Sequence, residues 1–117
     1  MIGAPPSGRV YLCLGATDMR RSFDGLGAIV QQVLAQDPFS GAWFVFRNRR
    51  GDRLKILCWD GSGYCQYYKR LEQGTFPFPS LDERVMSLSG AQLSLLLEGI
   101  DWRRLVARSL PTPQAAA

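Results

Sequence analysis

The chain has no histidine, only three cysteines, and no apolar run long enough to cross a bilayer. Histidine is the commonest ligand for zinc, copper and iron, and Cys13, Cys58 and Cys65 form no Cys-x-x-Cys pair, so we expect no metal site and no cofactor. A spanning helix needs about 20 apolar residues, and the first ten residues lack the charged and apolar regions of a secretion signal. These absences predict a cytoplasmic protein without membrane contact.

Catalytic motifs are scarce as well. No serine lies in a Gly-x-Ser-x-Gly elbow, no glycine-rich loop carries a Walker lysine, and no histidine can act as a base. Most aspartates lie beside glycine or proline, where aspartate serves turns. The sequence therefore predicts a protein that is not an enzyme. One enzymatic alternative stays open, which is Mg²⁺-dependent chemistry at Asp52 and Asp60.

The length and composition fit one globular domain. The chain has 117 residues, of which 46% are hydrophobic and 21% charged. Residues 1–8 and 109–117 are rich in glycine, proline or alanine and have no apolar face, so we expect flexible tails there. The sequence thus predicts a single domain over residues 9–108.

The stretch from residue 37 to residue 70 alternates aromatic-rich segments with glycine turns. Turn signals at 48–52 and 60–63 separate three predicted strands near 42–47, 53–59 and 64–70. Pairing of Trp59 with Tyr64 sets Cys58 opposite Cys65, where a disulfide is geometrically possible, but in a reducing compartment we expect two buried thiols.

Other elements flank this meander. Residues 9–14 form a predicted strand, and a helix is predicted from an N-cap at Ser22 to residues 36–38, where close packing on the sheet would compensate for Gly25 and Gly27. Residues 84–88 form a short strand, and a capping box at 89–92 opens a second helix, whose predicted core stripe is Leu93, Leu96, Leu97 and Ile100. The predicted fold class is α+β: an antiparallel β-meander of three core strands plus one or two short strands, packed with two main helices. Its strand order stays open.

Positive charge is concentrated in the meander. The formal net charge of the chain is only +4, but arginine dominates locally and binds phosphate with two parallel hydrogen bonds. Adjacent Arg49 and Arg50 lie at a predicted hairpin tip, which suits contact with DNA. The candidate nucleic-acid-binding residues are Arg47, Arg49, Arg50, Arg53, Lys55, Lys69 and Arg70.

Strand alternation predicts two faces for the meander. The predicted core face is formed by Phe44, Phe46, Leu54, Ile56, Cys58, Cys65 and Tyr67. The other face carries aromatic residues among basic ones, which could stack on bases, be covered by the helices, or form a protein interface. The candidate stacking or interface residues are Trp43, Trp59, Tyr64, Tyr68 and, after the second helix, Trp102.

Long segments of the chain resemble a known family. The runs DMRRSFDGLGAIV (18–30), DPFSGAWFVFRNRRGDRLKILCWDGSGYCQYYKRLEQGTFPFP (37–79) and LSGAQLSLLLEGIDWRR (88–104) are similar to the TnpB accessory protein, the second open reading frame product of insertion-sequence-66-type transposable elements. The resemblance implies a bacterial, non-catalytic protein that supports transposition beside a separate transposase. It does not extend to the RNA-guided nucleases that share the TnpB name.

Two hypotheses for the mechanism follow. In the first, the chain is an accessory factor that binds DNA, at element ends or intermediates, through the basic β-hairpin. In the second, it is a protein-interaction module that docks on the transposase of the same element or self-associates, without direct DNA contact. In that case the aromatic residues or the 93–102 segment form the interface.

Overall fold

The structure is a computed structural model that describes residues 8–103. The predicted tails lie outside the described residues, apart from Gly8, and so does the predicted domain end at residue 108. Between residues 8 and 103, no helix has the length and apolar character needed to span a bilayer.

The described chain builds one five-stranded sheet. The strands are β1 (Val10–Ala16), β2 (Trp43–Arg47), β3 (Arg53–Trp59), β4 (Tyr64–Arg70) and β5 (Val85–Leu88), in the spatial order β4-β3-β2-β1-β5. β2, β3 and β4 pair antiparallel in sequence, and β5 pairs antiparallel with β1. β1 and β2 run parallel.

The predicted α+β class is confirmed, and the sheet is mixed, because β1 and β2 run parallel whereas the other strand pairs run antiparallel. The physical reason is α1 (Phe23–Gln32), which follows β1 and returns the chain to the end where β1 began, so that β2 runs in the same direction. β1 thereby joins the meander at β2, and β5 adds to the free edge of β1.

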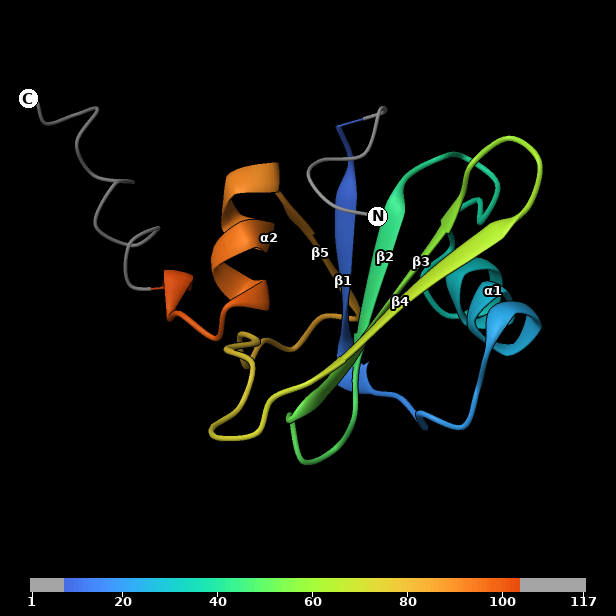
Figure 1. The fold of residues 1–117 in the computed structure, drawn as a ribbon. Helices are drawn as coiled ribbons and strands as arrows, with labels where there is room; N and C mark the ends of the chain where they lie inside the picture. The colour runs from blue at the N-terminus through green and yellow to red at the C-terminus, as the bar shows by residue number, and fades with distance from the viewer. Residues whose placement is uncertain (1–7, 104–117) are drawn as a thin grey trace, which may run out of the picture.

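Helices cover both faces of the sheet. α1 lies on one face and α2 (Gly90–Leu97) on the other, which gives three layers (Figure 1). Leu26 and Val30 of α1 pack with Phe44 and Phe46, whereas Leu93 and other apolar side chains of α2 pack on the opposite face. The sheet is therefore the centre of two cores and not a half-exposed platform.

The predicted division of the meander into two faces is wrong for β2. Phe44 lies opposite Leu57, and Val45 lies opposite Ile56. Four residues separate Asn48 from Arg53, which pair through a backbone hydrogen bond, so even-numbered residues of β2 share a face with odd-numbered residues of β3. Phe44 and Phe46 consequently face α1, away from Leu54 and Ile56.

The start of α1 and the close packing of its glycine on the sheet agree with the prediction, but the helix ends earlier than expected. Ser22 is the N-cap of α1, although its hydroxyl donates to Gln66 Oε1 at 3.3 Å and makes no capping bond. A Cβ on Gly27 would lie 2.7 Å from the Tyr64 hydroxyl, so this glycine permits close packing of α1 on β4. The helix ends at Gln32, four residues before the expected stop.

The early end of α1 is marked by Ala35, the one non-glycine residue with a positive φ (56°) among residues 8–103. The N–H of Leu34 donates to Ile29 O and the N–H of Gln36 donates to Val30 O, at 3.0 Å each, so bonds wider than those of an α-helix close this end. A residue with this left-handed backbone conformation is usually glycine, because a Cβ is strained there.

We expect Ala35→Gly to raise the free energy of unfolding by about 0.5–1 kcal/mol, since relief of the strain exceeds the added entropy of the unfolded chain. Urea denaturation followed by circular dichroism measures this change. Ala28→Gly, inside α1, is the control and should lower stability by about 1 kcal/mol. A loss of stability in both variants would contradict the expectation.

The second helix begins as predicted. Ser89 Oγ accepts from the N–H of Gln92, and Gln92 Oε1 accepts from the N–H of Ser89, which completes the capping box. Leu93 and Leu96 are fully buried. Ile100 lies after the helix and is 49% exposed, so its predicted place in the core stripe is wrong.

Candidate nucleic-acid interface

The turn between β2 and β3 is held by the side chain of Asn48. Its Oδ1 accepts from the N–H groups of Gly51 (2.9 Å) and Arg53 (3.0 Å), and its Nδ2 donates to Asp52 Oδ1 (2.8 Å). Gly51 has a φ of 81°, which the turn requires of it. The backbone oxygens of Gly51 and Asp52 accept from residues 76 and 71, which bind the turn to the following segment. The tip is therefore a fixed support for the arginines it carries.

Two of these arginines project into solvent. Arg49 is exposed, and its guanidinium has no hydrogen bond or ion pair with any of residues 8–103. Arg50 has a side chain that is 84% exposed, and its one ion pair, with Asp52, is long at 3.9 Å. Such a surface pair contributes little energy, so both guanidinium groups can accept a new anionic partner.

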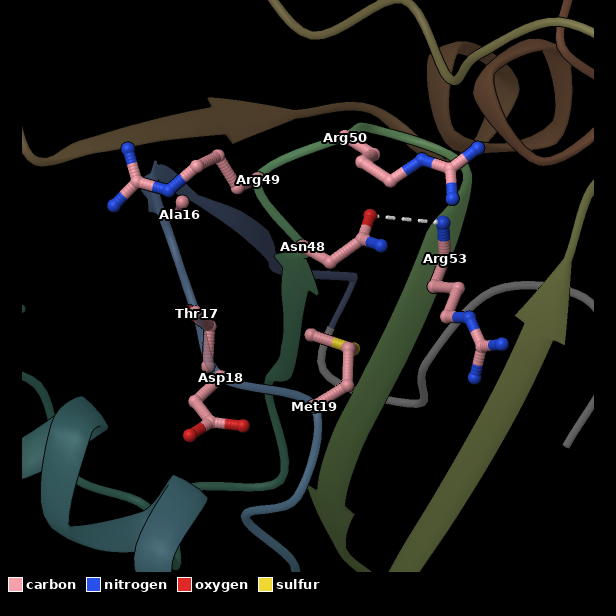
Figure 2. Close-up of a pocket in the computed structure, with 8 residues that line it drawn as sticks. All are labelled: Ala16, Thr17, Asp18, Met19, Asn48, Arg49, Arg50 and Arg53. Carbon is pink, nitrogen blue, oxygen red and sulfur yellow. Dashed lines mark hydrogen bonds between the residues drawn. The ribbon is translucent and has the colours of Figure 1, made fainter.

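A shallow hollow of about 360 Å³ lies between this tip and the loop after β1. Figure 2 shows the Arg49 side chain beside Ala16, Arg50 and Arg53 on the other rim, and Met19 pointing toward the turn. The residues that line the hollow are Ala16, Thr17, Asp18, Met19, Asn48, Arg49, Arg50 and Arg53. Three guanidinium groups thus border one concave surface.

Both carboxylates near the hollow are already engaged. Arg20 donates to both oxygens of Asp18, at 2.6 to 3.0 Å, and this hydrogen bonding lowers the pKa of Asp18 to about 2. The hydrogen bond from Asn48 lowers the pKa of Asp52. The negative charges of the site are therefore balanced locally, and the Arg49 charge remains uncompensated.

Two further candidates extend the positive surface along the sheet. Arg53 and Arg70 are directly paired across β3 and β4, and Arg70 is exposed with an ion pair to Glu72 at 3.1 Å. Arg53 Nη1 donates to the hydroxyl of Tyr68 at 2.9 Å, and Tyr68 is 46% exposed. Arg53, Tyr68 and Arg70 share the α1 side of the sheet near the hairpin tip.

The other three basic candidates make internal contacts. Lys55 is 5% exposed, and its Nζ donates to the backbone oxygens of Met19 and Arg21, at 2.7 Å each. Lys69 Nζ donates to Leu97 O at 2.7 Å, at the end of α2. Arg47 is half-buried, and its Nη2 donates to a backbone oxygen of β1 at 2.7 Å. The geometry gives these three side chains structural partners, which separates them from Arg49 and Arg50.

The aromatic candidates do not share one surface. Trp43 (6% exposed) and Trp102 (1% exposed) belong to the core on the α2 side. Trp59 and Tyr64 are half-buried and contact each other edge to face, with ring centroids 5.4 Å apart, at the end of β3 opposite the arginine tip. Their expected common face with Trp43 is therefore wrong, for the same reason of register in β2.

The third option, metal chemistry at Asp52 and Asp60, is contradicted by the fold. The two residues flank opposite ends of β3, so roughly 25 Å of extended chain separates them. Among residues 8–103, no cluster of three histidine, cysteine or acidic residues could hold a metal ion.

The two strand cysteines lie where the pairing predicts. Cys58 is directly opposite Cys65, and both are free thiols, with Cys58 buried and Cys65 half-buried. Burial, together with the neighbouring Cys65 and Asp60, raises the pKa of Cys58 to about 11. Thiolate formation is thus suppressed at neutral pH, which does not suit a reactive cysteine.

Sequence reasoning missed the part of the hollow that precedes α1. Thr17, Asp18 and Met19 fall between the predicted first strand and the predicted first helix, yet they line the hollow together with the arginine tip. The missing signal was the parallel pairing of β1 with β2, which brings the loop after β1 beside the turn after β2. Phe23 and Phe39 were also missed. They stack on Tyr64 from α1 and from the loop before β2.

The fold and site define a class: a small α+β protein with a mixed five-stranded sheet, helices on both faces, and an exposed arginine pair at one hairpin tip. Residues 8–107 match the family model described as IS66 Orf2 like protein. The chain belongs to this family, which confirms the resemblance and indicates an accessory role in transposition of an insertion sequence.

Two curated relatives come from Sinorhizobium fredii (strain NBRC 101917 / NGR234). The uncharacterized protein y4hO is 48% identical over 101 residues, which cover 84% of this chain and 88% of the relative. The uncharacterized protein y4jC is 38% identical over 117 residues, which cover both chains completely. No solved structure gives a significant match.

Proposed function

We propose that this chain is a non-catalytic accessory factor that binds DNA during transposition and assists a separate transposase of the same element. The observation that carries the proposal is the arginine tip: Arg49 has no partner among the described residues, Arg50 has only a long one, and Asn48 fixes the turn beneath them. A guanidinium on a rigid support loses little entropy when it binds a phosphate, and it can donate two hydrogen bonds.

Phosphate contacts would supply most of the affinity. Arg53 and Arg70 continue the positive surface along β3 and β4, and the half-exposed ring of Tyr68 lies beside them on the α1 side. The phosphate groups of a strand passing over the tip would meet Arg49 and Arg50 first, because both side chains are exposed there. Binding of this kind positions the protein and is largely independent of base sequence.

The triple variant Arg49→Ala, Arg50→Ala and Arg53→Ala tests the proposal. We expect DNA affinity to fall by on the order of a hundredfold at low salt, because charge-assisted hydrogen bonds to phosphate are lost. The slope of log affinity against log salt concentration should become shallower by about 0.9 for each contact removed. A gel shift with element-end DNA across a salt series measures both quantities.

The control is Arg9→Ala, which removes one exposed positive charge just before β1, where β1 pairs with the start of β2 and so lies away from the tip. This variant should leave the salt slope unchanged, whereas Arg49→Ala alone should lower it. DNA binding that survives the triple change, or that responds equally to the loss of Arg9, rejects the arginine tip as the DNA site.

A protein interface is the second candidate function, and one observation favours it. Phe39 is 56% exposed and Phe23 is 44% exposed, although both stack on Tyr64. A pull-down of the transposase that persists at high salt and without DNA would support this second function. If the transposase is retained only when DNA is added, the result supports the DNA-binding function and not a direct protein interface.

A further inference from the structure

An aromatic cluster lies at the end of the sheet opposite the arginine tip. The ring of Tyr64 stacks on Phe39 (centroids 5.6 Å apart) and on Phe23 (6.3 Å), and Trp59 meets Phe39 edge-on at 5.1 Å. Figure 1 shows the β3–β4 turn and the loop before β2 together at this end, far from the β2–β3 turn. Phe23 and Phe39 are more exposed than a core residue would be. The cluster is therefore an ordered aromatic surface.

Three carboxylates flank this surface. Asp24 adjoins Phe23, Asp37 precedes the loop that carries Phe39, and Asp60 follows Trp59. None of the three forms an ion pair with a cation among residues 8–103. Asp37 and Asp60 use one oxygen each to accept backbone N–H bonds within their own turns, at 2.9 to 3.0 Å.

The charges of these carboxylates reach the aromatic rings. Burial raises the pKa of Tyr64, and the negative charges of Asp24 and Asp37 raise it further. Hydrogen bonds from two backbone N–H groups lower the pKa of Asp60, so it stays ionised at neutral pH. The three carboxylates outnumber Arg9, which lies at the same end of the sheet and donates to Ser40 O at 3.4 Å.

We propose that this acidic aromatic patch, formed by Phe23, Asp24, Asp37, Phe39, Trp59, Asp60 and Tyr64, binds an arginine- or lysine-bearing segment of a protein partner. Guanidinium and ammonium groups are attracted both to aromatic faces and to carboxylates, and the patch offers the two together. The same carboxylates repel nucleic acid. The patch and the arginine tip thus bind ligands of opposite charge at opposite ends of one sheet, and neither proposal depends on the other.

A labelled peptide of alternating arginine and alanine tests the charge requirement, with fluorescence anisotropy as the readout. The combined variant Asp24→Asn, Asp37→Asn and Asp60→Asn keeps a carbonyl oxygen to accept the turn hydrogen bonds. We expect it to bind the peptide about tenfold more weakly, because up to three surface ion pairs are lost. A peptide with glutamate in place of arginine should not bind.

A matched control removes the same charge elsewhere. Asp82→Asn, Glu83→Gln and Glu98→Gln together neutralise three exposed carboxylates outside the patch. This control should bind the arginine peptide as the unmodified chain does. Equal weakening in both triple variants would show non-specific attraction and overturn the proposal, and so would unchanged binding by the patch variant.

The tryptophan emission localises the contact. Trp43 and Trp102 are almost fully buried, so a change in emission on peptide binding should come from Trp59. In Trp59→Phe this change should vanish while the anisotropy still reports binding. In Phe39→Ala, which removes an exposed ring, the affinity should fall by about threefold to fivefold. An emission change that persists in Trp59→Phe places the peptide elsewhere and overturns the proposal.

Two crossed measurements keep this inference distinct from the DNA-binding function. Arg49→Ala with Arg50→Ala should weaken DNA binding and leave peptide binding intact, and the patch variant should weaken peptide binding without weakening DNA binding. If sedimentation shows self-association that both of these variants abolish, the occupant is the arginine tip of a second copy, and the proposed separate partner is rejected.

Discussion

Replacement of Trp102 by alanine is expected to lower the free energy of unfolding by about 3–5 kcal/mol. The side chain is 1% exposed and is the largest of the fully buried side chains among residues 8–103. It packs in the core on the α2 side together with Leu93, Leu96 and the phenylalanines of the segment after β4. Its loss would leave a cavity between α2 and the sheet. Guanidinium denaturation followed by circular dichroism measures the effect.

The control for this prediction is Trp102→Phe. Phenylalanine keeps most of the ring volume and removes the indole Nε1–H, which is buried without a hydrogen-bond partner in the described structure. The loss of stability should therefore be only about 1 kcal/mol. A Trp102→Ala protein that keeps its stability but loses binding to DNA or to a partner would contradict a core role and restore the predicted interface role.

Trp102 illustrates what the sequence could and could not predict. Strand and turn positions in the meander follow from local signals, and the structure places β3 and β4 over the predicted ranges. The capping box of α2 is also local. Burial of Trp102 depends on contacts with β-strands that are far away in the sequence. A tryptophan followed by two arginines has the same local sequence whether it lies in a core or at an interface.

The register between β2 and β3 is a second feature that the sequence alone could not predict. One residue more or less in the paired turn reverses which side chains of a strand share a face with its neighbour. The sequence shows where the turn lies, but the bond between Asn48 and Arg53 decides the register. Phe44 and Phe46 consequently face α1, whereas Trp43 faces α2 and does not share a face with Tyr64.

The arginine tip could be predicted from local sequence signals, whereas the hollow beside it could not. Adjacent arginines in a glycine-containing turn predict an exposed cationic tip, and Arg49 and Arg50 are exposed. The opposite wall, formed by residues 16–19, depends on the parallel pairing of β1 with β2. That pairing is a non-local choice, since a first strand can add to either edge of a meander.

Lys55 carries the second large prediction. Its ammonium is buried on the α1 side, donates to the carbonyls of Met19 and Arg21, and lies 4.7 Å from the ring centre of Tyr68. These bonds fix the loop between β1 and α1, which forms one wall of the hollow. In Lys55→Met, two carbonyls lose their donor and the cation–π contact disappears. We expect the free energy of unfolding to fall by about 2–4 kcal/mol.

Lys69→Met is the matched control, because Lys69 donates to a single backbone oxygen, that of Leu97, from a half-buried position. Its loss should destabilise the protein by about 1 kcal/mol.

The two roles considered for Lys55 predict opposite effects of Lys55→Met on stability and on the salt dependence of DNA binding. A phosphate contact predicts a shallower salt dependence of DNA binding, by about 0.9, with stability unchanged. The buried contacts predict a large loss of stability and, in the fraction that remains folded, an unchanged salt slope, because Arg49 and Arg50 are carried by a different loop.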